Sequence, residues 1–130
     1  MARLNAIARR LRRWLRKQSP AKTYSAVVTV ESMTDVPDEL ENDIFVVQRG
    51  GLLRWALLMC PCGCGYRLTV NLMRTVRPCW RLALKDGKAS LSPSIWVSET
   101  KCGSHFWLTK NGVFWCPKYH ERYFESEGEV

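Results

Sequence analysis

The sequence predicts a small, mainly β (α+β) domain in which antiparallel hairpins surround a zinc site, preceded by a basic amphipathic N-terminal helix. Three observations support this class. The chain has 130 residues, which suits one domain with an appendage. Its apolar residues fall in short β-rich runs separated by turns that contain glycine. Four of its six cysteines, together with His105, fall in two tight groups with the spacing of metal ligands.

The first expected element is a helix over residues 2–17, within an N-terminal segment 1–18. Apolar residues recur there every three or four positions, and basic residues occupy the other face. Ser19-Pro20 ends the helix. Residues 1–22 hold eight of the 20 basic residues and no acidic one, so the rest of the chain is formally neutral although the net charge is +8.

This basic helix has four possible roles, because its apolar stripe can pack on the domain's own core, on a partner protein, along nucleic-acid phosphates or on an anionic membrane. Packing on the domain's own core is the simplest of the four. The candidate contacts with a partner or with phosphate are Arg9, Arg10, Arg12, Arg13, Arg16 and Lys17.

The β domain is expected over residues 23–120. Strands are predicted at 23–30 and 44–48, and the acidic segment between them, which contains Pro37, is predicted to be a loop with one short helical turn. Three hairpins follow, with strands at 52–59 and 66–72, at 80–84 and 89–91, and at 105–108 and 113–115. The acidic tail, 121–130, is expected to be flexible.

The first hairpin ends in Cys60-Pro61-Cys62-Gly63-Cys64-Gly65, which places cysteines at alternate positions. Side chains at such positions of a regular strand lie about 6.6 Å apart. Two thiolates on one zinc ion lie only about 3.8 Å apart. Proline and the two glycines allow the backbone to leave strand geometry and to curl around an ion.

The second group is Cys102-Gly103-Ser104-His105. Two cysteines of the first group and this pair complete a tetrahedral site of three cysteines and one histidine, so one cysteine among 60, 62 and 64 is spare or supplies a further contact. Cys116 is a possible ligand, because the last hairpin returns it near His105. One structural zinc is expected, although iron remains an alternative, and a closed site of four ligands contributes folding energy rather than catalysis.

Other cysteine chemistry is less consistent with the sequence. Cys79, between Pro78 and Trp80, is expected to be a buried apolar residue. Neighbouring cysteines in the first group do not reach the geometry of a disulfide with one another. The N-terminal segment lacks the apolar stretch of an export signal, and no apolar run approaches the length of a membrane span. A reducing cytoplasm is therefore the expected location.

Between Pro37 and Trp115, over about 60% of the chain, the sequence resembles the bacterial and phage domain-of-unknown-function family 6527. The motifs that carry this resemblance are Pro37-Asp38-Glu39-Leu40, Cys60-Pro61-Cys62-Gly63-Cys64-Gly65, Trp80-Arg81-Leu82, Leu91-Ser92-Pro93-Ser94-Ile95 and Cys102-Gly103-Ser104-His105-Phe106-Trp107. The resemblance implies metal binding by Cys60, Cys62, Cys64, Cys102 and His105. It also implies an association with a bacterial ubiquitin-like conjugation pathway, with a ubiquitin-like protein or its E1- or E2-like enzymes as partners.

The leading functional prediction is a noncatalytic interaction module of such a pathway, in which zinc holds two hairpins rigid. One alternative is a zinc-ribbon-like nucleic-acid-binding protein that uses the arginine helix. A metallohydrolase or isopeptidase is the other, although the sequence has no His-Glu-x-x-His motif and no phosphate-binding glycine loop. The cluster of aromatic residues near the zinc is expected to be mostly core, while Trp107 lies on the face of His105 and is a candidate partner contact.

Overall fold

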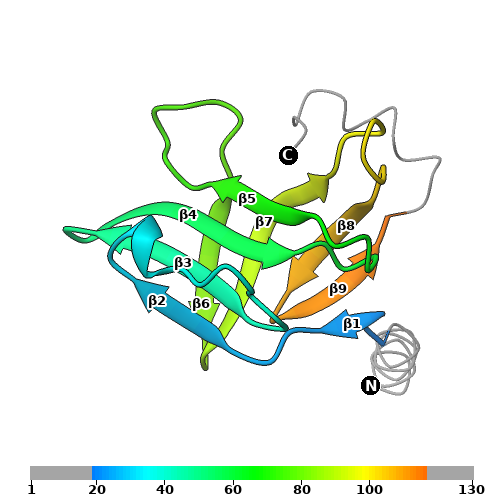
Figure 1. The fold of residues 1–130 in the computed structure, drawn as a ribbon, viewed down its shortest axis with the longest axis horizontal. Helices are drawn as coiled ribbons and strands as arrows, with labels where there is room; N and C mark the ends of the chain where they lie inside the picture. Colours follow the sequence, from blue (N-terminus) through cyan, green and yellow to red (C-terminus); the bar gives the residue numbers. More distant parts are fainter. Residues whose placement is uncertain (1–18, 117–130) are drawn as a thin grey trace, which may run out of the picture.

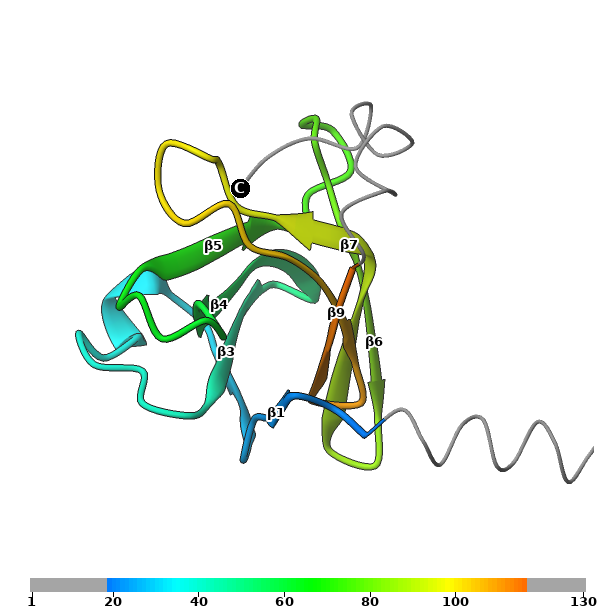
Figure 2. The same cartoon turned by 90° about the vertical axis from the view of Figure 1, so that its right-hand side faces the viewer.

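The protein, described here by a computed structural model over residues 19–116, consists of two β-sheets whose inner faces share one core (Figures 1 and 2). The mainly β class is confirmed. The predicted helix at 2–17 with its six basic contact residues, and the acidic tail at 121–130, lie outside the described residues.

Nine strands and one short 3-10 helix make up this part of the chain. They are β1 (Lys22–Thr23), β2 (Val27–Val30), η1 (Met33–Asp35), β3 (Ile44–Arg49), β4 (Leu52–Met59), β5 (Arg67–Asn71), β6 (Arg81–Lys85), β7 (Lys88–Trp96), β8 (His105–Thr109) and β9 (Gly112–Trp115). The three predicted hairpins are β4–β5, β6–β7 and β8–β9, and the predicted helical turn is η1. The segment predicted as one strand over 23–30 is divided between β1 and β2.

The two sheets have the strand orders β1-β9-β8-β7-β6 and β2-β3-β4-β5. All pairs are antiparallel except β2 and β3, which run parallel with Val27 opposite Ile44. The prediction of antiparallel hairpins did not include this pair, because its strands are joined by the longer segment that contains η1. Division of residues 23–30 lets β1 join one sheet and β2 the other, so the start of the domain links both sheets.

The main core lies between the sheets. Its fully buried side chains come from both of them, for example Val46, Leu58 and Val70 from one sheet and Ile95 and Phe106 from the other. A second, smaller cluster lies on the opposite face of β3 and β4, where Val36 and Leu40 of the η1 segment cover that face; its other buried members are Phe45, Val47 and Leu57. Burying this apolar area is the main stabilising contribution.

Asn111 joins three parts of the fold. It lies in the β8–β9 turn with a φ of 65° and is 2% exposed. Its Oδ1 accepts a hydrogen bond from the Ala89 amide at 2.7 Å, and its Nδ2 donates to the Tyr24 carbonyl at 3.3 Å. Its own backbone N–H and C=O bond the same two residues at 2.8 Å. The turn formed by Lys110 and Asn111 therefore serves both as a hairpin turn and as a buried link between β7 and the residue that follows β1.

Replacement of Asn111 by alanine is expected to lower the free energy of unfolding by about 2–4 kcal/mol. It removes two buried hydrogen bonds, and alanine adopts a positive φ less readily than asparagine. Asn111→Gly keeps the backbone conformation and should be the milder change. Urea denaturation of both variants measures the difference. Equal stability of Asn111→Ala and the unchanged protein would contradict this role.

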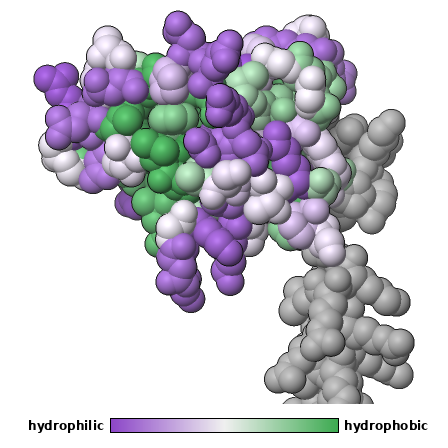
Figure 3. All heavy atoms as spheres, turned by 60° about the horizontal axis from the view of Figure 1, so that its bottom comes forward, coloured by the Kyte–Doolittle hydropathy of each residue, from purple (hydrophilic) through white to green (hydrophobic). Residues whose placement is uncertain are grey.

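The exposed apolar side chains of the described residues are spread over several elements. Large apolar side chains that remain exposed come from different strands and loops: Val28, Met33, Leu52, Val76, Leu84 and Trp115. Figure 3 shows one face, on which an apolar area borders protruding hydrophilic side chains. Among residues 19–116, no helix has the length and apolar character needed to cross a membrane.

Candidate functional site

Four cysteine thiols come together where two loops of different sheets meet. Cys60, Cys62 and Cys64 lie in the loop between β4 and β5, and Cys102 lies in the loop between β7 and β8. Their four Sγ atoms all lie within 4.8 Å of one another. Within the described part of the chain, this group can therefore hold a metal ion, and it joins the two sheets at that end.

The distances within the group fit a tetrahedral metal site. The Sγ atom of Cys60 lies 3.4 Å from that of Cys62 and 3.6 Å from that of Cys102. Thiolates bound to one zinc ion with bonds of 2.3 Å are separated by about 3.8 Å. Four sulfur donors in such a group are typical of structural zinc and of iron sites.

The backbone of the β4–β5 loop brings these thiols together. The Cys60 amide donates to the Tyr66 carbonyl at 2.8 Å, which closes the loop, and the Tyr66 amide donates to Cys64 Sγ at 3.4 Å. Gly63 has a φ of 85°, a conformation that few other residues adopt without strain. The Lys101 ammonium lies 3.9 Å from the centre of the Tyr66 ring, which adds a contact between the two loops.

The protons are unevenly distributed among these thiols. Burial raises the pKa of Cys60 to about 12. Burial also opposes ionisation of Cys62, but hydrogen bonds from Ser104, Cys64 and Cys60 outweigh it and lower the pKa of Cys62 to about 6. Hydrogen bonds to a thiolate stabilise its charge, so Cys62, one of the two exposed cysteines of the group, ionises more readily than the buried Cys60.

A serine and a histidine form a second arrangement in the same region. Ser94 Oγ lies 2.7 Å from His105 Nε2, and the two side chains are 2% and 6% exposed. Ser94 lies near the end of β7, and His105 is the first residue of β8. A serine hydroxyl within hydrogen-bond distance of an imidazole nitrogen is the arrangement of a nucleophile and its general base.

An irregularity in the β7–β8 pairing positions this serine. Leu91 pairs with Leu108 and Ile95 with Phe106, so three residues of β7 lie opposite one residue of β8. Such bulges change the direction of side chains and occur often beside active sites. The bulge contains Ser92, Pro93 and Ser94.

The surroundings of the pair fix both side chains. The Trp96 ring stacks on the His105 ring with 5.9 Å between centroids, and Trp96 is also the partner of His105 in the strand register. The Trp80 indole Nε1 donates to the Ser94 carbonyl at 3.2 Å. These contacts give a preorganised pair in a region of low polarity, where hydrogen bonds are stronger than in water.

His105 therefore has a different neighbour from the one predicted. Among residues 19–116 the clustered ligand atoms are four thiols, and the imidazole of His105 is not one of them. Its Nε2 lies within hydrogen-bond distance of Ser94 on the neighbouring strand β7. The cluster includes Cys60, Cys62 and Cys64 together, whereas the predicted site needed only two of them as ligands.

The remaining predicted residues have clear positions. The Cys116 amide donates to the His105 carbonyl at 2.9 Å, as the hairpin argument expected, but its thiol is outside the group of four. Cys79 lies partly exposed in the β5–β6 loop and is not in the group either. Phe106 and Leu108 are buried and Trp107 is only partly so, which agrees with the predicted alternation; its role as a partner contact stays a prediction.

Sequence reasoning did not identify Ser94 as functional. No Gly-x-Ser-x-Gly motif surrounds it, and the sequence gives no reason to prefer Ser94 over Ser92 in the same short segment as a nucleophile. The segment Leu91–Ile95 was part of the family resemblance, and this was the only signal that pointed to it. The hydroxyl and the imidazole meet only through the strand register.

Comparison with known proteins gives one match. The family model described as bacterial ubiquitination-like system serine protease (BubE) matches residues 32–116, about two thirds of the chain. The matched range includes the four clustered thiols and the pair Ser94 and His105. No curated protein and no solved structure matches the chain.

Proposed function

The chain belongs to the BubE family, and on that premise we propose that it is a serine protease of a bacterial ubiquitination-like system. Ser94 is the nucleophile and His105 the general base. The observation that carries the proposal is the 2.7 Å approach of Ser94 Oγ to His105 Nε2 within a bulged strand. The substrate is an amide bond of the ubiquitin-like protein, either in a precursor or in a conjugate.

In the proposed reaction, Ser94 Oγ attacks the carbonyl carbon of the amide while His105 Nε2 takes the hydroxyl proton. The resulting imidazolium gives that proton to the leaving amine, the C–N bond breaks, and an ester to Ser94 remains. Water then attacks the ester with His105 again as base, which releases the carboxylic acid and restores the serine. No oxidant, reductant or further reactant is needed.

The four cysteines hold a structural zinc ion in this proposal. Sulfur donors 3.4–3.6 Å apart support it, because they match the spacing of ligands on one zinc. When bound, the ion joins the β4–β5 loop to the β7–β8 loop and contributes folding energy. His105 follows Cys102 by three residues, so anchoring the β7–β8 loop also keeps the general base facing Ser94.

A catalytic role differs from the noncatalytic module that the sequence favoured. The prediction of a ubiquitin-like pathway agrees with the family, while the prediction of a noncatalytic role is not supported by a family described as a protease or by a serine beside a histidine. The predicted alternative of a metallohydrolase or isopeptidase is closer to the proposed function, but the proposed nucleophile is a serine and not a metal-bound water. The nucleic-acid alternative relied on the arginines of residues 1–18, which lie outside the described residues.

Covalent labelling tests the proposed nucleophile without knowledge of the substrate. Purified protein is incubated with a fluorophosphonate, which reacts with a serine only when a base activates it. We expect one adduct, on Ser94, located by mass spectrometry of the peptides. Labelling should be absent from Ser94→Ala and strongly slowed in His105→Gln, which keeps a polar side chain but cannot accept a proton from the serine in the same way.

Ser90→Ala is the matched control, because Ser90 lies four residues earlier on β7 and its hydroxyl accepts a hydrogen bond from the Lys110 amide. This variant should be labelled as fast as the unchanged protein. A folded protein that carries no adduct on Ser94 after prolonged exposure would overturn the proposed function. Labelling that persists in His105→Gln at an unchanged rate would remove the assignment of the base.

A further inference from the structure

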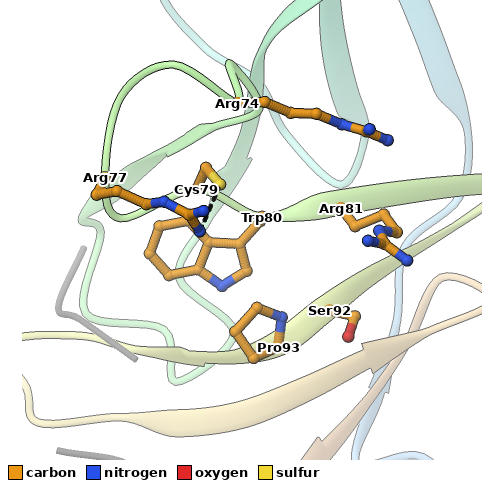
Figure 4. Close-up of a pocket in the computed structure, with 7 residues that line it drawn as sticks. All are labelled: Arg74, Arg77, Cys79, Trp80, Arg81, Ser92 and Pro93. Carbon is orange, nitrogen blue, oxygen red and sulfur yellow. Dashed lines mark hydrogen bonds between the residues drawn. The ribbon is translucent and has the colours of Figure 1, made fainter. Parts of the chain in front are cut away.

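A positively charged pocket lies beside the proposed nucleophile. It has a volume of about 560 Å³ and is lined by residues of the β5–β6 loop, of β6 and of the bulged part of β7. Figure 4 shows these side chains: Arg74, Arg77, Cys79, Trp80, Arg81, Ser92 and Pro93. Among the described residues that line it, three are arginines and none is acidic.

Two sides of the pocket lie next to Ser94. Ser92 and Pro93 of β7 form one side, and Ser94 is the next residue, so the Cα atoms of Ser92 and Ser94 are no more than about 7 Å apart. On the other side, the Trp80 ring lines the pocket and donates its Nε1 hydrogen to the Ser94 carbonyl at 3.2 Å. A substrate side chain bound in this pocket would lie within a few residues of a peptide bond held at Ser94.

The arginines are carried by a well-ordered framework. Arg81 pairs with Ser92 across the β6–β7 ladder. Arg74 and Arg77 lie in the β5–β6 loop, which the buried Asn71 holds in place: its Nδ2 lies 2.9–3.2 Å from the carbonyls of Met73, Val76 and Pro78. The backbone of the loop is therefore held in place, which keeps Arg74 and Arg77 close to the pocket.

We propose that this pocket is a specificity subsite for acidic side chains of the polypeptide substrate, within about three residues of the cleaved bond; this inference rests on the proposed function. Arginine binds carboxylates through two parallel hydrogen bonds, and three arginines without a neighbouring acid in the pocket favour more than one carboxylate. An extended peptide advances about 3.3 Å per residue, so a residue two or three positions from the cleaved bond reaches the pocket.

A polypeptide is favoured over nucleic acid by the shape of the site. Phosphate binding without sequence preference uses basic residues spread along an extended groove or face. Here three arginines line one pocket together with Trp80 and Pro93, next to a group proposed to cleave an amide bond. Nucleic acid is therefore an outcome of the test rather than the proposed ligand.

Binding is measured with the full chain carrying Ser94→Ala, so that no cleavage is required. The probes are hexaglutamate, hexaglutamine and a single-stranded oligonucleotide, each labelled with fluorescein. Their binding is measured by fluorescence anisotropy at about 150 mM salt, where interactions between distant charges are largely screened. Two double variants are compared. Arg77→Gln with Arg81→Gln alters the pocket, and Arg49→Gln with Lys85→Gln removes the same net charge from exposed positions that do not line it.

We expect the pocket variant to weaken hexaglutamate binding by about tenfold or more, as the loss of two charge-assisted contacts predicts, and the control variant by less than about threefold. Hexaglutamine should bind weakly to all proteins. Equal losses in both double variants would overturn the subsite, and so would a larger effect of the pocket variant on the oligonucleotide.

The outcome is separable from that of the proposed function. Fluorophosphonate labelling of Ser94 without charge-selective peptide binding would remove the subsite and leave the protease. Charge-selective binding through the arginines without labelling would leave a site for acidic polypeptides and remove the hydrolytic role.

Discussion

Replacing Ser94 by alanine is expected to lower the rate of hydrolysis by about 10³- to 10⁶-fold while the protein stays folded. The variant removes the attacking oxygen and leaves His105 with no nucleophile to activate. Release of the ubiquitin-like product is measured by mass spectrometry of the reaction over time. The fold should persist, because the strand register and the core do not depend on the hydroxyl.

A purely structural hydrogen bond predicts the opposite result. The pair is buried, so loss of the hydroxyl leaves an imidazole nitrogen without that partner and costs about 1–3 kcal/mol of stability. If this were the only role, Ser94→Ala would show a lower unfolding temperature and an unchanged rate per folded molecule. Measuring both quantities on the same preparation separates the two interpretations.

The double variant gives a sharper criterion. Residues that act as one catalytic unit have strongly non-additive effects, so Ser94→Ala with His105→Gln should be no slower than Ser94→Ala alone. Two independent contributions would multiply instead. Ser90→Ala on the same strand should keep the full rate, and a rate loss there comparable to that of Ser94→Ala would contradict the assignment of the nucleophile.

The parts of the fold that local chemistry determines were predictable from the sequence. Alternating apolar residues and turn residues locate the hairpins, and Asp86-Gly87 forms the expected turn between β6 and β7. The β8–β9 turn is one residue earlier than expected, with Lys110 and Asn111 at positive φ. The assignment of strands to two sheets and the parallel β2–β3 pair depend on contacts between distant residues, which periodicity does not encode.

The thiol cluster and the pair Ser94 and His105 also differ in how far the sequence predicts them. The thiol cluster was predictable because three of its members lie in a five-residue segment with a spacing that only metal binding explains well. The Cys-x-x-His spacing identified His105 as a candidate ligand, but it could not indicate the 2.7 Å approach of its imidazole to Ser94, because this contact comes from another strand. Ser94 has no local signature, and its meeting with His105 requires the irregular register of β7 and β8.

Replacing Cys102 by serine is expected to have the largest effect on stability, with loss of the metal and of more than about 5 kcal/mol of unfolding free energy, enough to unfold a domain of this size. Cys102 is the only cysteine of the group that comes from the β7–β8 loop, so its loss separates the two sheets at this end. Metal content by elemental analysis and thermal unfolding by circular dichroism measure the two effects.

Cys79→Ser is the matched control for this change. Cys79 is outside the thiol group, and the variant should keep one metal ion per chain and lose no more than about 1 kcal/mol. A chelator should unfold both the unchanged protein and the Cys79→Ser variant, and should have no further effect on Cys102→Ser. A folded, fully metal-loaded Cys102→Ser protein would contradict the site.

Loss of the metal should also lower the reactivity of Ser94, because His105 follows Cys102 by three positions in the same segment. When the β7–β8 loop loses its anchor to the β4–β5 loop, the start of β8 keeps its strand pairs with Trp96 and Trp115 and the stacking of Trp96 on the imidazole, but the loop that leads into it is less restrained. Fluorophosphonate labelling of Ser94 should therefore fall in proportion to the metal content as a chelator removes the ion. Labelling that survives complete removal of the metal would show that the serine and histidine do not depend on the thiol site.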